Sequence, residues 1–258
     1  MGWTARRPAG GGGDRPVRRS LESMARSGTV RHRIAVSLAA SLWLAVWAGT
    51  AAAQPVDLEL ILAIDCSYSV DDAEFALQRS GMAEAFMTET VISAIEAGKF
   101  GAIAVTVVQW SSLTSQAMSV PWTVVHDTAS AQDFAARIAG MERTSEEGGT
   151  SISAMINVGI ILFDVNRFEG TRKVIDISAD GPNNNGPKIA PVRALAIDKG
   201  VTVNGLTILH EDKTLDYYFR NRVITGDDAF VVKASGYENY VEAILQKLVR
   251  EIGNPATS

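Results

Sequence analysis

The stretch Asp65-Cys66-Ser67-Tyr68-Ser69 follows an apolar run, Leu58 to Ile64, and precedes a long helical pattern. The apolar run predicts a buried, central strand. Side chains alternate along a strand, so the carboxylate of Asp65 and the hydroxyls of Ser67 and Ser69 point to the same side. In an open α/β sheet, ligands bind at the carboxyl ends of the strands. The stretch therefore predicts one half of a site for a hard metal ion.

Strands and helices alternate along the rest of the chain. A short gap joins the second and third expected strands into a hairpin, and Pro121 favours an edge position for the third. Beyond the hairpin, the alternation predicts a doubly wound α/β sheet with helices on both faces. Strands are expected at residues 57–64, 101–110, 116–125, 172–179, 201–209 and 229–234, and helices at 71–97, 128–140, 151–166, 188–199, 215–223 and 237–251.

Residues 1–53 differ in composition from the rest. They carry eight arginines against two acidic residues, and an apolar, small-residue run that begins at Ile34 ends in Ala51-Ala52-Ala53. This pattern predicts a secretory signal peptide cleaved after Ala53, with Met24 as the true start. The alternative is an uncleaved membrane anchor, since the run reaches the lower limit for a span. The small residues and the cleavage motif favour a periplasmic or secreted protein with no membrane span after cleavage.

The remaining residues, 54–258, are expected to form one domain of about 205 residues with a single core. Removing the leader's 8 basic and 2 acidic residues from the totals of 24 and 29 leaves 16 and 27, a net charge of −11. Such an acidic domain is a poor match for nucleic acid or for anionic membrane surfaces. The one cysteine, Cys66, excludes an intramolecular disulfide, and its place at a strand end favours a packed thiol.

Two later segments add polar side chains at the same expected edge of the sheet. Thr150 follows Gly148-Gly149 at the start of a helix, and Asp180 follows the strand at 172–179. Hydroxyls combined with carboxylates suit a hard divalent cation, Mg²⁺ first, with Mn²⁺ or Ca²⁺ as further candidates. Each segment also has a local explanation, because Ser, Thr and Asp cap helices and the residues after Asp180 are turn formers. The ordered combination favours the metal site.

The five positions carry a resemblance. Asp65-x-Ser67-x-Ser69, Thr150 in Gly-Gly-Thr and Asp180 in Ala-Asp-Gly resemble the metal-ion-dependent adhesion site (MIDAS) of von Willebrand factor type A (vWA) domains. The resemblance covers residues 56–252 and implies a Rossmann-like fold, mostly parallel, with one antiparallel edge strand. It implies direct metal contacts from the two serines and the threonine, while both aspartates act through waters and hydrogen bonds. The departures, Cys66 and the Ser-Ala pair before Asp180, remove no ligand.

The function implied by this resemblance is binding of a protein ligand, without catalysis. An acidic residue of the partner would complete the shell of the ion. More narrowly, the leader, the turn that runs from Asp180 to Gly186 and the domain size resemble an exported bacterial family of vWA-like proteins of unassigned function.

The competing interpretation is an enzyme, a phosphatase of the haloacid dehalogenase type that uses Asp65 as its nucleophile. That class also ends its first strand with an Asp and has a late turn similar to Asp180–Asn184. Its chemistry needs a second carboxylate two residues after the nucleophile as the general acid, and this chain has Ser67 there. A vWA domain that binds partners without metal is disfavoured, because every expected ligand is present.

Overall fold

The computed structural model describes residues 53–145 and 148–253. The description below concerns the unit Ala51–Ser258. Except for Ala53, the predicted signal peptide lies outside the described residues. None of the described helices is long and apolar enough to cross a membrane.

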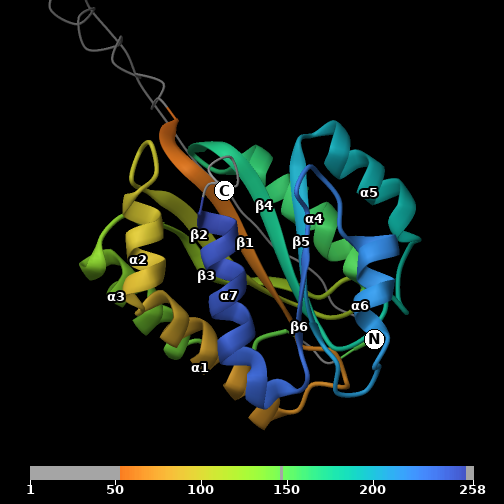
Figure 1. The fold of residues 1–258 in the computed structure, drawn as a ribbon. Coiled ribbons are helices and arrows are strands. Elements are labelled where there is room, and N and C mark those ends of the chain that lie inside the picture. The colour runs from red at the N-terminus through yellow and green to blue at the C-terminus, as the bar shows by residue number, and fades with distance from the viewer. Residues whose placement is uncertain (1–52, 146–147, 254–258) are drawn as a thin grey trace, which may run out of the picture. The chain divides into compact units, whose positions relative to one another are not determined.

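This unit is built on a six-stranded sheet with the strand order β3-β2-β1-β4-β5-β6 (Figure 1). All neighbouring strands pair in parallel except β2 and β3, which form an antiparallel hairpin with β3 at the edge. The predicted doubly wound α/β sheet, mostly parallel with one antiparallel edge strand, is confirmed. The strands are β1 (Gln54–Asp65), β2 (Ile103–Trp110), β3 (Gln116–Val125), β4 (Phe168–Ala179), β5 (Val201–Ile208) and β6 (Val231–Ala234).

Helices cover both faces of this sheet (Figure 1). One core lies between the sheet and α1, α2, α3 and α7, and a second core lies between the sheet and α4, α5 and α6. The helices are α1 (Asp72–Phe86), α2 (Glu89–Glu96), α3 (Thr128–Ala139), α4 (Ile152–Val165), α5 (Ile189–Asp198), α6 (Leu215–Tyr218) and α7 (Tyr240–Ile252). A π-helical turn, Phe219–Val223, follows α6, and a 3₁₀ turn, Tyr237–Asn239, precedes α7.

The central strand β1 explains why its sequence is apolar without alternation. Leu58, Leu60 and Leu62 belong to the core under α1 and α7, whereas Ile61 and Ala63 belong to the core under α4. Helices therefore cover each face of the strand, so the residues from Leu60 to Ile64 are apolar whichever face they point to. The strand delivers Asp65 to the carboxyl edge of the sheet, next to Trp110 at the end of β2.

The prediction of a single helix at residues 71–97 is wrong, because the structure has two helices there. Helix α1 ends at Phe86, and α2 begins at Glu89 with Thr88 as its N-cap. The Thr88 hydroxyl accepts the Val91 N–H at 3.4 Å and donates to the Ala85 carbonyl at 2.8 Å. A side chain that satisfies backbone groups of both helices stabilises the break between them, although the apolar periodicity continues across it.

Both ends of the described domain lie at the amino edge of the sheet, away from Asp65. The first residue of β1, Gln54, pairs with Phe168 at the start of β4. The last residue of α7, Ile252, accepts a hydrogen bond at 3.1 Å through its carbonyl from Arg172, which is also near the start of β4.

Candidate metal centre

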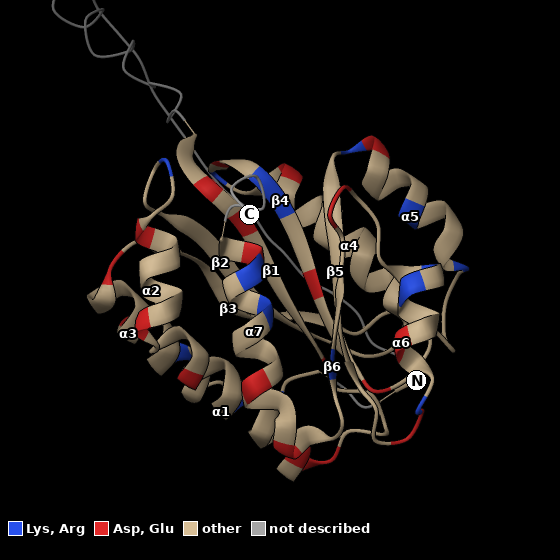
Figure 2. Cartoon of the chain, in the orientation of Figure 1, with Lys and Arg blue, Asp and Glu red and all other residues tan. Residues whose placement is uncertain are grey.

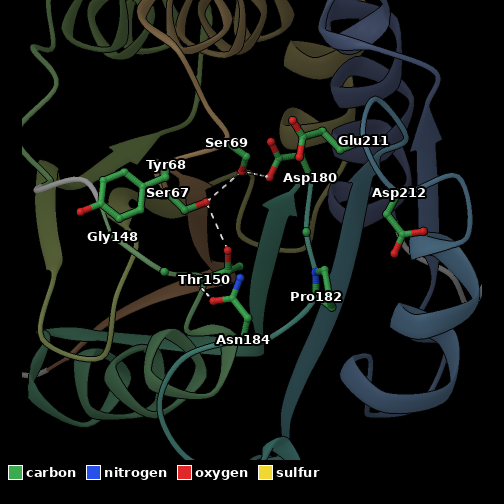
Figure 3. Close-up of a pocket in the computed structure, with 12 residues that line it drawn as sticks. Ser67, Tyr68, Ser69, Gly148, Thr150, Asp180, Pro182, Asn184, Glu211 and Asp212 are labelled. Atoms are coloured by element: carbon green, nitrogen blue, oxygen red, sulfur yellow. Dashed lines mark hydrogen bonds between the residues drawn. The ribbon is translucent and has the colours of Figure 1, made fainter.

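Four of the five residues expected to form a metal site, Ser67, Ser69, Thr150 and Asp180, lie together at the carboxyl edge of the sheet (Figure 3). Ser69 Oγ donates to Asp180 Oδ1 at 2.8 Å and lies 3.3 Å from Ser67 Oγ. Thr150 Oγ1 donates to Ser67 Oγ at 3.3 Å. Three hydroxyls from two separate loops thus form one row that ends on a carboxylate, and the buried Asp65 is linked to this row because its Oδ1 accepts the Ser67 N–H. Their role as ligands remains a prediction.

The serines of the β1–α1 loop are not consumed as helix caps. Asp71 is the N-cap of α1, where its side chain accepts the Glu74 N–H at 2.8 Å and Glu74 Oε2 accepts the Asp71 N–H at 2.9 Å. This reciprocal capping box satisfies the first turn of α1 by itself. Ser67 and Ser69 therefore keep their hydroxyls for the row, and the local explanation of their presence does not apply.

Thr150 is held by the loop after β4 rather than by helix α4. The N-cap of α4 is Ser151, whose side chain makes no capping bond. Instead, Asn184 Oδ1 accepts the Thr150 N–H at 2.7 Å, and the Thr150 carbonyl accepts the N–H groups of Asn184 at 2.9 Å and Asn185 at 3.1 Å. The sequence identified this asparagine-rich segment as a turn, but not as the support that positions Thr150.

Asp180 receives hydrogen bonds from two directions. Ser69 donates to Oδ1, and Tyr237 in the 3₁₀ turn before α7 donates its phenol proton to Oδ2 at 3.0 Å. Burial raises the pKa of Asp180, and these two donors oppose the increase. Tyr237 was missed at the sequence level, because a tyrosine 57 residues away along the chain has no local motif that would link it to Asp180.

Asp65 is a buried carboxylate without a full set of partners. Its side chain is fully buried, and Oδ1 accepts the Ser67 N–H at 2.8 Å. Oδ2 has no hydrogen-bond partner among the described residues. Burial raises the pKa of Asp65 to about 8, and the nearby charge of Asp180 adds to the increase. A divalent cation near the two carboxylates would offset both the burial and the repulsion, so this donor set fits such an ion.

The ligand atoms of the candidate centre limit which metal ion it can bind. In the described ranges, no three His, Cys, Asp or Glu side chains gather closely enough to hold a metal. The candidate centre relies on hydroxyl oxygens supported by carboxylates, and all of these are hard ligands. They match Mg²⁺, Mn²⁺ or Ca²⁺ better than a metal that prefers sulfur or imidazole.

A pocket of about 580 Å³ opens over the row of hydroxyls. Its walls include Ser67, Ser69, Thr150 and Asp180, together with Glu211 and Asp212 from the loop after β5. No Lys, Arg or His is among the described residues that line it. The two additional carboxylates were not singled out from the sequence, since a polar loop after a strand is common and shows no spacing to the other motifs.

Comparison with known proteins gives a family. The family described as "Protein of unknown function (DUF1194)" matches residues 55–256. The chain belongs to this family. The match covers β1 to α7, and therefore every residue of the candidate centre. No curated protein is significantly similar in sequence to this DUF1194 member.

Solved structures confirm the vWA-type fold. Proximal thread matrix protein 1 from the mussel byssus, with a zinc-occupied MIDAS motif, is 18% identical with a TM-score of 0.56 over 76% of this chain and 48% of its own. A von Willebrand factor type A protein from Catenulispora acidiphila is 18% identical with a TM-score of 0.54, and the match covers 77% of this chain and 43% of that protein. The vWF domain of the pilus tip protein Mfa5 from Porphyromonas gingivalis is 12% identical with a TM-score of 0.52, and the match covers 79% of this chain and 98% of that domain. The DUF1194 chain thus spans about half the length of the first two, and the likeness is one of fold.

Proposed function

We propose that this protein is a metal-ion-dependent protein-binding module. Ser67, Ser69 and Thr150 contact the ion directly, and Asp65 and Asp180 hold it through waters and hydrogen bonds. The row of three hydroxyls that ends on Asp180 carries the proposal, because each oxygen in it lies within 3.3 Å of the next and the row joins separate loops. When bound, the ion supplies a Lewis-acidic position that a carboxylate of the partner can fill.

Mg²⁺ is the proposed ion, with Mn²⁺ and Ca²⁺ as alternatives. Neutral hydroxyls leave more positive charge on the ion than carboxylates would, so an acidic side chain from outside is attracted. A zinc-occupied MIDAS motif in the mussel protein supports a divalent ion at this place in the fold. The acidic net charge of residues 54–258 makes nucleic acid an unsuitable partner.

The geometry supports binding rather than catalysis. A phosphatase that used Asp65 as its nucleophile would need that carboxylate to face its substrate. Asp65 is fully buried and does not line the pocket, and the residue two positions later is Ser67 rather than a general acid. We therefore propose a non-enzymatic role. The predicted leader and the pilus and byssus proteins that share the fold support a place in the periplasm or outside the cell.

Calorimetric titration of the full chain with MgCl₂ and MnCl₂ tests the metal site. Ser67→Ala and Thr150→Ala each remove one hydroxyl of the row, and we expect each to weaken binding at least tenfold, about 1.4 kcal/mol. Ser80→Ala is the matched control, because Ser80 is exposed on α1 and its hydroxyl donates only to the Leu77 carbonyl.

Equal affinity in wild type, Ser67→Ala and Thr150→Ala would refute the assignment of ligands. The phosphatase alternative makes a different prediction. Hydrolysis of a generic phosphate ester that Asp65→Asn abolishes would favour the enzyme.

A further inference from the structure

The pocket over the hydroxyl row is strongly polarised in charge. Its wall on the β5–α6 side carries Glu211 and Asp212, and Asp180 forms part of its floor. Glu211 is exposed and lines the pocket together with Asp180. Acidic residues also occupy the first turn of α1 at this edge of the sheet (Figure 2).

The neighbouring cation does not neutralise this wall. Lys213 follows Asp212 directly, but its ammonium group donates to the Leu209 carbonyl at 2.6 Å. Asp212 is fixed by its own turn, since Oδ1 accepts the N–H of Thr214 at 2.8 Å and its hydroxyl proton at 2.7 Å. The Asp212 carboxylate is therefore anchored on the wall of the pocket rather than loose in solvent.

The opposite wall carries one aromatic side chain, Tyr68. Figure 3 shows Tyr68 on the far side of the hydroxyl row from Glu211 and Asp212. The Tyr68 side chain is 74% exposed, while its backbone N–H is fixed to the Gly148 carbonyl at 3.0 Å. A large exposed side chain on a fixed backbone is available for contact with a bound segment.

These two walls conflict with a simple acidic ligand. Even if a divalent ion balances Asp65 and Asp180, a partner's carboxylate at the ion still lies beside Glu211 and Asp212. Like charges across an interface oppose binding unless a cation compensates them. A partner that brings its own cation removes the conflict.

We propose that the partner is a protein segment in which the metal-binding carboxylate has a lysine or arginine next to it. The basic side chain lies against Glu211 and Asp212, and the other side of the segment packs on Tyr68. This inference rests on the proposed function, since it describes the partner of the same metal centre.

The test uses the full chain saturated with Mg²⁺ and three synthetic hexapeptides. The peptides are identical except for the residue beside a single Asp, which is Lys, Gln or Glu. At low ionic strength we expect the Lys peptide to bind about two- to fivefold more tightly than the Gln peptide, with the Glu peptide weakest. The difference in affinity between the Lys and Gln peptides should shrink in 0.5 M NaCl, because at about this ionic strength exposed charges are screened within a few ångströms.

Two double variants identify the source of this preference. In Glu211→Gln/Asp212→Asn, the Lys and Gln peptides should bind equally. In Asp133→Asn/Asp198→Asn, which removes the same charge from exposed positions on α3 and α5, the preference should persist. Each variant is compared at Mg²⁺ concentrations above its own dissociation constant, so that altered metal affinity does not enter.

The outcomes separate this inference from the proposed function. A chain that binds none of Mg²⁺, Mn²⁺ and Ca²⁺ removes the metal site and overturns both. A chain that binds metal but binds the Lys and Gln peptides equally, or binds none of the peptides, overturns only the proposed partner chemistry.

Discussion

Asp180 depends on a residue that belongs to a different part of the chain. Its two carboxylate oxygens are held separately, Oδ1 by Ser69 and Oδ2 by Tyr237. A carboxylate with both oxygens bonded cannot rotate freely, so Asp180 presents a fixed face to the row of hydroxyls. Tyr237 is thus a positioning residue for the candidate centre rather than a ligand.

Replacing Tyr237 by Phe removes only the hydroxyl group and so tests whether Tyr237 positions Asp180. We expect Mg²⁺ affinity to fall severalfold and the free energy of unfolding to fall by about 1–2 kcal/mol, because a hydrogen bond to a charged group is lost. Tyr240→Phe is the matched control, since the Tyr240 hydroxyl bonds Ser178 at 3.1 Å and does not contact the row. Calorimetry and urea unfolding measure the two quantities. If Tyr240→Phe weakens Mg²⁺ binding as much as Tyr237→Phe does, Tyr237 has no special role.

At the scale of elements, the loop after β4 connects the β2–β3 hairpin to the loop that precedes α4. Asn184 fixes Thr150, and Asn185 Oδ1 accepts the Leu113 N–H at 2.8 Å from the β2–β3 hairpin. The loop is therefore a clamp between the hairpin and the start of α4. This clamp adds to the bond between the Tyr68 N–H and the Gly148 carbonyl, which also holds the Thr150 loop beside the Ser67 loop.

Asn184→Ala should loosen this clamp. The Thr150 N–H loses its side-chain acceptor, which we expect to cost about 1–2 kcal/mol of stability and several-fold in Mg²⁺ affinity. Asn221→Ala provides the comparison, because Asn221 is exposed and its amide donates only to the Tyr217 carbonyl. Urea unfolding and calorimetry distinguish them, and equal effects of both variants would contradict the clamp.

The sequence predicted elements better than it predicted their contacts. Hydrophobic periodicity and turn residues located six strands, and Pro121 indicated the edge strand correctly. The break at Thr88 was missed, because a local cap interrupted a pattern whose apolar period continues. The support from Tyr237 and Asn184 was also missed, since hydrogen bonds between distant segments depend on the folded arrangement and have no spacing in the sequence.

At the scale of the whole molecule, a buried group of charges joins α7 to the middle of the sheet. Lys247 Nζ lies 2.6 Å from Asp176 Oδ1 and 2.5 Å from Glu251 Oε1, and all three side chains are buried. Asn204 on β5 donates to Glu251 at 2.8 Å. One buried cation thus faces two carboxylates. Burial, and then the charge of Glu251, raise the pKa of Asp176 to about 8, while the Lys247 ammonium group opposes the increase.

The raised pKa of Asp176 makes stability depend on pH in a defined direction. Because the pKa of Asp176 is higher in the folded state, its contribution to stability is complete below about pH 4 and is lost as the pH rises toward 8. Linkage of one proton limits the slope to about 1.4 kcal/mol per pH unit. Asp176→Asn should flatten the decrease between pH 5 and pH 8 in urea unfolding, whereas Asp133→Asn should not. Parallel profiles for wild type and Asp176→Asn would exclude a raised pKa of Asp176.

The position of the two ends of the domain decides how the protein can be displayed. Gln54 and Ile252 both lie at the amino edge of the sheet, whereas the candidate centre lies at the carboxyl edge. An attachment made through either end, whether to a solid support or to another domain, therefore leaves the pocket facing outward. Such a domain can be held in place from one side while a partner docks on the other.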